Sequence, residues 1–280
     1  TGSSGDSVYE YTLSTGFAIS TASYSQSFSV TSQDSNPRGI TFNANGTKMF
    51  IVGDTNNSVF EYALTTGFDI STASYSQSFS VTSQLSNPNS LAFNTDGTKM
   101  LVLGYTSDSV YQYNLTTGFD LSTASYASVS FSVAAQDTFP YGIAFNTDGT
   151  KMYISGDAGN NVNEYTLSTG FDISTASYSD SLSVSAQDAN PRGITFNANG
   201  TKLFVVGVTS PAIYEYSIGT TSYTNQMDKT QLDAVTDPNH IALGDDLDLA
   251  IVFNMTSGST VPSSDGVAIN YDATVLNKGA

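Results

Sequence analysis

The chain of 280 residues contains no cysteine, no tryptophan and a single histidine, His240. The absence of cysteine excludes disulfides, thiolate metal sites and cysteine nucleophiles. A single histidine excludes histidine clusters for metals, and imidazole catalysis would depend on His240 alone. Because the surrounding segment DPNHIALG carries neither an HExxH motif nor a Ser-His-Asp order, we interpret His240 as a loop residue.

Basic residues and glutamates are also scarce. Eight Lys and Arg stand against 25 Asp and Glu, which leaves a formal net charge of −17. Nucleic-acid binding is disfavoured because neutralising phosphates requires Lys and Arg, and an anionic membrane surface is disfavoured for the same reason. Only four of the acids are Glu and 21 are Asp, and this excess of a turn residue disfavours helices. No apolar run approaches the ~20 residues of a membrane-spanning helix, so we expect no membrane insertion.

What the sequence does contain is a repeat with a period of 51 or 52 residues, marked by the equivalent lysines 48, 99, 151 and 202. A fifth copy starts at Ala212 and soon stops matching. The four full copies are Ser7–Gly53, Ser58–Gly104, Ser109–Gly156 and Asn161–Gly207.

Each copy predicts four strands. Asn45-Gly46 is a tight-turn signal, and the nearly continuous apolar run that follows it indicates a strand buried on both faces. The last strand alternates apolar and polar residues, as in an outer, half-solvated strand. In the first unit the predicted strands are Arg38–Asn43, Lys48–Val52, Ser58–Leu64 and Tyr75–Val81. Four antiparallel strands per ~51-residue unit predict an all-β protein built as a β-propeller. The alternative is a β-solenoid, whose coils are usually shorter.

The motif N-P-x-G-I-x-F-N-x-x-G-T-K-M-[FY]-[IV]-x-G, followed by S-V-Y-E-Y-x-L, resembles the blades of YncE-like and YVTN-type β-propellers. The spacer TTGFDISTASYSQSFSV is similar to repeat propellers of surface proteins of marine bacteria and of phage tail and structural proteins. This resemblance covers about Ser7–Ser217. It implies a propeller fold and a binding or structural role.

We expect two regions, propeller repeats over 1–221 and a small β-rich, sandwich-like segment over 222–280. The second region contains two strand-like runs, Leu247–Met255 and Gly266–Tyr271. The repeats divide into a partial blade at 1–30 and units at 31–81, 82–133, 134–184 and 185–221. The copies contain five third strands but only four of each other strand, so a closed four-bladed ring would leave one of the third strands unused. We therefore expect a fragment of a longer chain with five or more blades.

In a propeller, the loops that enter each first strand and each third strand lie on one face. Here these loops are Asp34–Gly39 and Gly53–Ser58 with their counterparts. The candidate ligand contacts are rim positions at which one copy departs from the repeat, together with charged rim residues. Leu85 is a further departure from the repeat. Neutral variation on a solvated rim is the alternative. The candidate rim residues are Arg38, Asp54, Tyr105, Phe139, Tyr141, Asp157 and Arg192.

Arg38 and Arg192 are the only arginines and share one repeat position. Two interpretations stay open: recognition of a carboxylate or sulfated sugar, or structural pairing with Asp34, Asp188 or Asp54. Exposed Tyr105 and Tyr141 could stack on sugars.

Other side chains recur in every copy and therefore indicate architecture. We expect the glutamate of the YEY motif to bond a neighbouring blade, the repeated lysine to serve the turn and solubility, and the repeated Tyr and Phe of the spacer to pack between blades. These positions are Glu10, Glu61, Gln112, Glu164 and Glu215; Lys48, Lys99, Lys151 and Lys202; Tyr24, Tyr75, Tyr126 and Tyr178; and Phe17, Phe68, Phe119 and Phe171.

We assign no catalytic residues and no metal site, and we expect no cofactor. Calcium is the one ion to weigh, but the Asp-rich loops lack EF-hand ligand spacing. The sequence favours a non-enzymatic extracellular or virion-surface module that binds a cell-surface glycan or other virion and surface proteins, or that serves structural assembly as a homo-oligomer. The alternative is a propeller-scaffold hydrolase or lyase.

Overall fold

The computed structural model describes residues 5–209 and 211–218. The chain divides into Thr1–Ser222 and Tyr223–Ala280. His240 and the β-rich segment expected at 222–280 lie outside the described residues.

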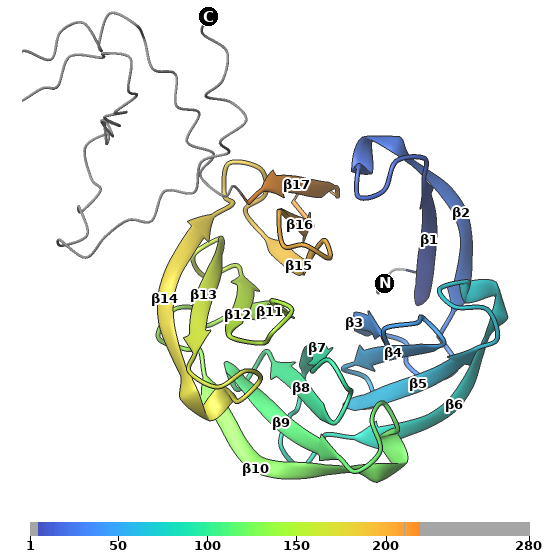
Figure 1. Ribbon diagram of the computed structural model, residues 1–280, viewed down its shortest axis with the longest axis horizontal. Helices are drawn as coiled ribbons and strands as arrows, with labels where there is room; N and C mark the ends of the chain where they lie inside the picture. Colours follow the sequence, from blue (N-terminus) through green and yellow to red (C-terminus); the bar gives the residue numbers. More distant parts are fainter. Residues whose placement is uncertain (1–4, 210, 219–280) are drawn as a thin grey trace, which may run out of the picture. The chain divides into compact units, whose positions relative to one another are not determined.

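The described part is an all-β propeller whose sheets are arranged around a central channel (Figure 1). Five antiparallel sheets, here called blades 1 to 5, follow one another in chain order, and each sheet keeps its strands in sequence order. Blade 1 has two strands, blades 2 to 4 have four each, and blade 5 has three.

The strands of the blades have the following bounds. Blade 1 is β1 (Ser7–Leu13) and β2 (Ala22–Ser29). Blade 2 is β3 (Pro37–Phe42), β4 (Lys48–Gly53), β5 (Ser58–Leu64) and β6 (Ala73–Ser80). Blade 3 is β7 (Pro88–Phe93), β8 (Lys99–Gly104), β9 (Ser109–Leu115) and β10 (Ala124–Ser132). Blade 4 is β11 (Pro140–Phe145), β12 (Lys151–Gly156), β13 (Asn161–Leu167) and β14 (Ala176–Ser183). Blade 5 is β15 (Pro191–Phe196), β16 (Lys202–Gly207) and β17 (Ile213–Ser217).

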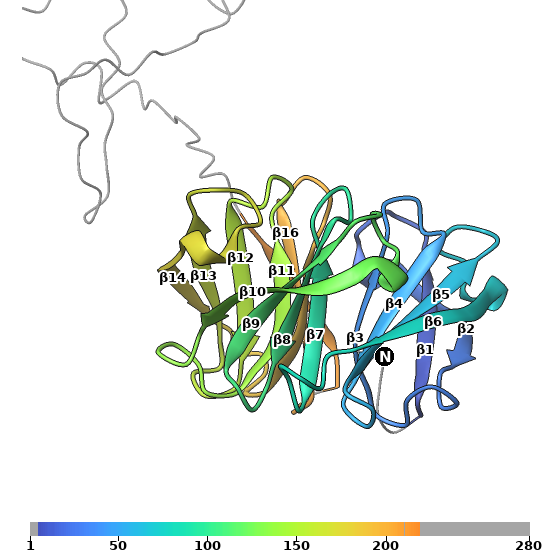
Figure 2. The ribbon, with the colours of Figure 1, turned by 90° about the horizontal axis from the view of Figure 1, so that it is seen from below.

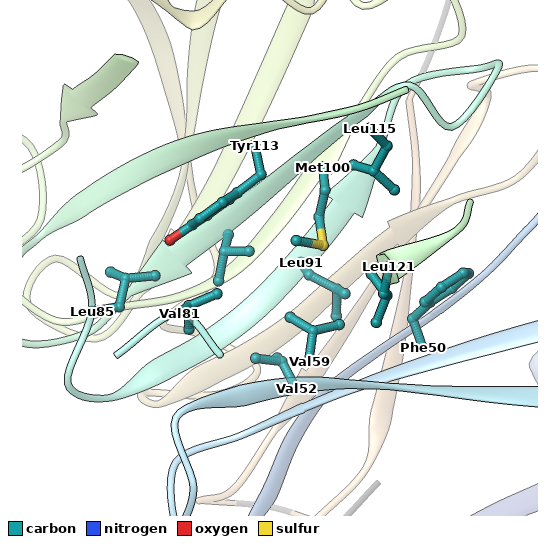
Figure 3. Close-up of a cluster of buried hydrophobic side chains, with 11 residues drawn as sticks. Phe50, Val52, Val59, Val81, Leu85, Leu91, Met100, Tyr113, Leu115 and Leu121 are labelled. Atoms are coloured by element: carbon teal, nitrogen blue, oxygen red, sulfur yellow. The ribbon is translucent and has the colours of Figure 1, made fainter. Parts of the chain in front are cut away.

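The first strands of blades 2 to 5 lie nearest the channel, where β3, β7, β11 and β15 contact one another in turn. The last strand of blades 2 to 4 forms the outer edge. Figure 2 shows the blades from the side. The second strands of blades 2 and 3 are buried on both faces, as predicted: Met49, Phe50, Ile51 and Val52 of β4 are all fully buried. In blade 5, Val206 of β16 is 43% exposed. Between blades 2 and 3, side chains of β4 and β5 meet those of β8 and β9 (Figure 3). Burying these faces against each other stabilises the stack, because a single blade cannot bury both of its faces.

A short 3₁₀ helix follows β1, β5, β9 and β13 and leads to the outer strand of the same blade. These helices are η1 (Ile19–Thr21), η2 (Ile70–Thr72), η3 (Leu121–Thr123) and η4 (Ile173–Thr175). The connector before η2 is held on the hairpin turn of its own blade. Gly46 has φ +70°, as the Asn-Gly turn requires, and a Cβ there would strike the ring of Phe68. The amide of Phe68 donates to the carbonyl of Gly46 at 3.0 Å, which fixes the connector in place.

The third copy is one residue longer than the others, and its outer strand accommodates the extra residue. The register between β9 and β10 shifts between Tyr126 and Val129, and Ser128 has φ +60°. A bulge therefore absorbs the insertion without moving the rest of the blade.

Glutamates of the YEY motif bond neighbouring blades, as predicted. Glu61 is almost fully buried in β5, and its Oε2 accepts from the amide of Leu121 in blade 3 at 3.2 Å. Glu10 of blade 1 accepts from the amide of Ile70 in blade 2 at 3.2 Å. Glu215 of blade 5 likewise accepts from the amide of Ile19 in blade 1 at 3.5 Å. Glu164 instead bonds Lys151 and Ser179 of its own blade, and Gln112 bonds Asn114, so the prediction was wrong for these two positions.

Lys48, Lys99 and Lys202 also join blades, so their interpretation as a turn and solubility feature was wrong, whereas Lys151 bonds Glu164 of its own blade. Lys48 Nζ lies 2.8 Å from Glu61 Oε1 and donates to the carbonyl of Phe119 in the next blade at 2.6 Å. Lys202 pairs with Glu215 at 2.6 Å and donates to the carbonyl of Phe17 at 2.9 Å. The lysine stem reaches over the blade edge, which repetition in the sequence did not reveal.

The repeated aromatic residues divide into two groups. Phe119 contacts Phe50 of the preceding blade at 6.2 Å between ring centroids, as inter-blade packing predicts. Tyr75, however, contacts Tyr62 of its own blade and is 46% exposed, so the prediction was wrong for this tyrosine. Tyr24 and Tyr178 are likewise exposed on outer strands, whereas Tyr126 packs against the hydrophobic cluster between blades 2 and 3.

Candidate functional site at the channel mouth

The rim loops are shaped by a buried aspartate in three of the blades. Asp34 is 1% exposed, and its carboxylate accepts from the amides of Asn36 at 2.7 Å and Asn56 at 3.1 Å. This carboxylate ties the loop before β3 to the loop after β4. Burial raises the pKa of the equivalent Asp137. The two loops therefore form one rigid unit that can hold exposed side chains in place.

The second copy departs from this pattern at Leu85, which was among the deviations considered for ligand contact. Leu85 is 2% exposed and packs in the hydrophobic cluster between blades 2 and 3 (Figure 3). It takes the place of the loop-tying carboxylate, so the deviation is structural and Leu85 lies away from the rim surface.

Three aromatic rings from two blades gather at the mouth of the channel. The Tyr105 ring, just after β8, lies 5.6 Å from the Phe139 ring and 5.2 Å from the Tyr141 ring of β11. Phe139 is 44% exposed. Such tilted contacts hold the rings as a group and leave π-faces open to a ligand. The sequence predicted each residue separately, and the ring of blades brings them together.

Two arginines reach the same mouth from blades on opposite sides of the aromatic group. Arg38 in β3 forms two hydrogen bonds to Asp54 Oδ2, from Nε at 3.1 Å and from Nη2 at 2.7 Å. Of the structural partners expected for the arginines, Asp54 is therefore confirmed for Arg38. Arg192 in β15 lies 4.0 Å from Asp157 of the neighbouring blade, a carboxylate that the sequence-based pairing did not include.

Arg192 is also placed over an aromatic face. Its guanidinium carbon lies 3.4 Å from the centroid of the Tyr141 ring, a cation–π arrangement. Burial, and the positive charge of Arg38 nearby, lower the pKa of Arg192. Two guanidinium groups therefore face one pocket, and each also has a carboxylate beside it, Asp54 for Arg38 and Asp157 for Arg192.

A pocket of about 230 Å³ lies between these side chains. It is lined by Arg38, Asp54, Asn87, Asn89, Tyr105, Tyr141 and Arg192, which come from four blades. Asn87 and Asn89 were missed by sequence reasoning. Asn89 stands at the repeat position of Arg38, so its departure from arginine was the available signal. Phe139 and Asp157 lie beside the pocket, in contact with Tyr105 and Arg192 respectively.

The chemistry of this pocket suits binding. Guanidinium, amide and phenol groups offer hydrogen bonds to an anionic or hydroxylated ligand. Pockets for drug-sized ligands span about 300–1,000 Å³, so this smaller one suits one sugar ring or a small anion. The carboxylate in its lining is Asp54, which Arg38 already engages.

Over 5–209 and 211–218, no group of three His, Asp or Glu side chains is placed to hold a metal ion. In the same part of the chain, no helix has the length and apolarity to cross a bilayer.

Comparison with known proteins finds no matching family model and no matching curated protein. Solved structures do match. A Lactobacillus plantarum protein aligns with TM-score 0.49 and 13% identity over 78% of this chain and 63% of its own. A Bacteroides uniformis protein, proposed to be a 6-phosphogluconolactonase, aligns with TM-score 0.48 and 14% identity over 77% of this chain and 65% of its own. A functionally unknown protein from Desulfotomaculum acetoxidans aligns with TM-score 0.48 and 10% identity, over 78% of this chain and 60% of its own. This chain thus spans less than two thirds of each of these proteins.

Proposed function

We propose that this chain is a non-enzymatic β-propeller module of an extracellular or virion surface, which binds an acidic cell-surface glycan at the channel mouth. The observation that carries the proposal is the convergence of Arg38, Arg192, Tyr105 and Tyr141 on one pocket. Stacking faces and cationic hydrogen-bond donors together suit a sugar ring that bears a carboxylate or sulfate.

Two features of the sequence agree with this setting. The repeat motif and its spacer resemble YncE-like and YVTN-type propellers and those of marine bacterial surface and phage tail proteins. The net charge of −17 suits solubility in a salty medium and leaves the two arginines as a local exception on an acidic surface.

A glycan array probed with the full 280-residue chain tests the proposal. We expect binding to carboxylated or sulfated glycans, weaker at 0.5 M than at 0.05 M salt because exposed charges are screened. Tyr141→Ala removes the surface beneath Arg192 and should weaken binding by about 2- to 12-fold, the range for an aromatic contact of ~0.5–1.5 kcal/mol.

The matched control is Tyr24→Ala, because Tyr24 is 59% exposed on an outer strand. It should leave glycan binding unchanged. Uniform absence of binding, together with stable oligomers in light scattering, would favour the assembly role instead. Turnover of a bound glycan, lost in Asp54→Asn, would favour the hydrolase or lyase alternative.

A further inference from the structure

Blade 1 presents an open strand edge beside the channel. In blades 2 to 4 the third strand lies between the second and fourth strands, as β5 does between β4 and β6. Its equivalent in blade 1, β1, pairs with β2 alone among the described residues. The second and first strand positions of this blade are therefore unfilled in the described part of the chain (Figure 1).

Contacts across the gap show that blade 1 occupies a regular blade position, directly after blade 5. Lys202 of blade 5 donates to the carbonyl of Phe17 in blade 1 at 2.9 Å. The same bond joins Lys48 of blade 2 to Phe119 of blade 3 at 2.6 Å. The Phe17 ring also stacks on Phe204 of blade 5 at 6.4 Å. Blade 1 thus contacts blade 5 as blade 3 contacts blade 2, so the opening corresponds to the first and second strand positions of blade 1.

Exposure of apolar side chains marks the same place. Tyr11 of β1 is 52% exposed, whereas its equivalents Tyr62, Tyr113 and Tyr165 are at most 1% exposed. Phe68 of blade 2 is 54% exposed, whereas its equivalent Phe119 packs on Phe50 in the second strand of the preceding blade. A cavity of about 1530 Å³ runs along the channel and into this opening, lined by Tyr9, Tyr11, Leu13, Ile40, Phe204 and Ile213 among others. An unpaired strand edge with apolar side chains on its flanks is a template for strand addition.

We propose that this opening receives a β-hairpin with the chemistry of the repeat's own first two strands, added to β1 by antiparallel pairing. The occupant is defined by what fills the same place in the four other blades. Its inner strand matches Pro37–Phe42, its turn carries Asn-Gly or Asp-Gly, and its second strand matches Lys48–Gly53.

The register of the internal copies specifies how the hairpin seats. In blade 2, Val52 pairs with Val59 and Met49 with Tyr62. The occupant's residues at the positions of Val52 and Met49 would therefore pair with Val8 and Tyr11. A continuous apolar run is required, because β4 has both faces buried.

The occupant must also supply a lysine at the start of its second strand. Lys48 pairs with Glu61 at 2.8 Å, and the equivalent pairs in blades 4 and 5 measure 2.9 Å and 2.6 Å. In blade 1 the matching carboxylate is that of Glu10, and the matching carbonyl across the blade boundary is that of Phe68. Glu10 accepts from Gln26 Nε2 at 2.9 Å, so its carboxylate is already oriented toward that position.

A fluorescently labelled synthetic peptide of residues 36–53 (NPRGITFNANGTKMFIVG) tests this with the full chain. Fluorescence anisotropy should show saturable binding, and hydrogen exchange should show new protection of Ser7–Leu13 amides. A peptide with alanine at the Lys48 position should bind about two- to fivefold more weakly, the range for a partly exposed ion pair. With the Glu10→Gln chain, the two peptides should bind alike. A scrambled peptide of the same composition is the control.

A fused variant keeps the test decisive if the free peptide associates with itself. Residues 36–51 are placed before Thr1, so that the hairpin meets β1 at the repeat's own spacing. This variant should unfold at a higher temperature than the chain carrying the scrambled fusion, with β1 amides protected. If neither the peptide nor the fusion protects β1, the proposal is wrong. Protection of β1 without peptide, in a dimer seen by light scattering, would assign the opening to a second copy and overturn it.

Discussion

The tie between blades that centres on Glu61 gives the sharpest test of how the ring is held together. The glutamate side chain is 3% exposed and receives Lys48 at 2.8 Å, Gln77 at 2.7 Å and the Leu121 amide at 3.2 Å. In Glu61→Gln the side chain keeps its volume, and one amide oxygen can still accept from Leu121. The same oxygen position accepts from Gln77, so the new NH₂ group must face the ammonium of Lys48.

The expected cost follows from these contacts. A mismatched buried donor costs about 1–3 kcal/mol, and the loss of the ion pair adds up to ~1 kcal/mol, because Lys48 is 31% exposed. We expect a loss of about 1–4 kcal/mol in the free energy of unfolding. For a domain of this size that corresponds to a fall in Tm of about 2–16 °C.

Urea unfolding of the full chain, followed by circular dichroism and tyrosine fluorescence, measures this loss. Glu164→Gln is the matched control, because Glu164 is 23% exposed and contacts Lys151 and Ser179 of its own blade. The control should cost less than about 1 kcal/mol. Equal losses in the two variants, or a change of under about 0.5 kcal/mol in Glu61→Gln, would refute the inter-blade account.

Three further outcomes are expected. Gly53→Ala should lower the urea midpoint by the equivalent of about 1–3 kcal/mol, because the new Cβ would meet the carboxylate of Asp34; an unchanged midpoint would contradict the close packing. Gln112→Glu should raise stability by up to ~1 kcal/mol, since it restores the ion pair that three other blades possess and replaces a buried Oε1 without a hydrogen-bond partner; a lower midpoint would argue against it. A hydrogen bond from Gln77 lowers the pKa of Asp120 below 3.8 in the folded state, so the charged carboxylate stabilises the fold above that value and loses this effect as the pH falls through its lowered pKa. The stability difference between the wild-type chain and Asp120→Asn should therefore be full at pH 6 and shrink below pH 4, and a constant difference would refute it.

Local features of the fold could be predicted from the sequence, because they depend on residues close together in the chain. The Asn-Gly dipeptide required a tight turn, and Gly46 has φ +70°. The run after Lys48 predicted a strand buried on both faces, and β4 is fully buried from Met49 onward. Repetition of Glu61 in four copies indicated an architectural bond to the next blade, which the structure confirms.

Repetition alone misled where the length or direction of a side chain mattered. Lys48 looked like a surface turn residue, but its stem reaches the carbonyl of Phe119 across the blade boundary. Tyr75 looked like a packing residue, but it lies on the exposed face of the outer strand. Both errors concern which neighbour a side chain meets, and that depends on the angle between successive blades.

The sequence by itself determined the four-stranded unit, its turns and the face on which the rim loops lie, because turn chemistry and apolar periodicity act over a few residues. Only the tertiary structure decided that Arg192 lies over Tyr141 and near Arg38, since these residues are 51 and 154 positions apart and meet through the curvature of the ring. The same curvature returns blade 1 to blade 5, where the described residues fill two of the four strand positions, β1 and β2.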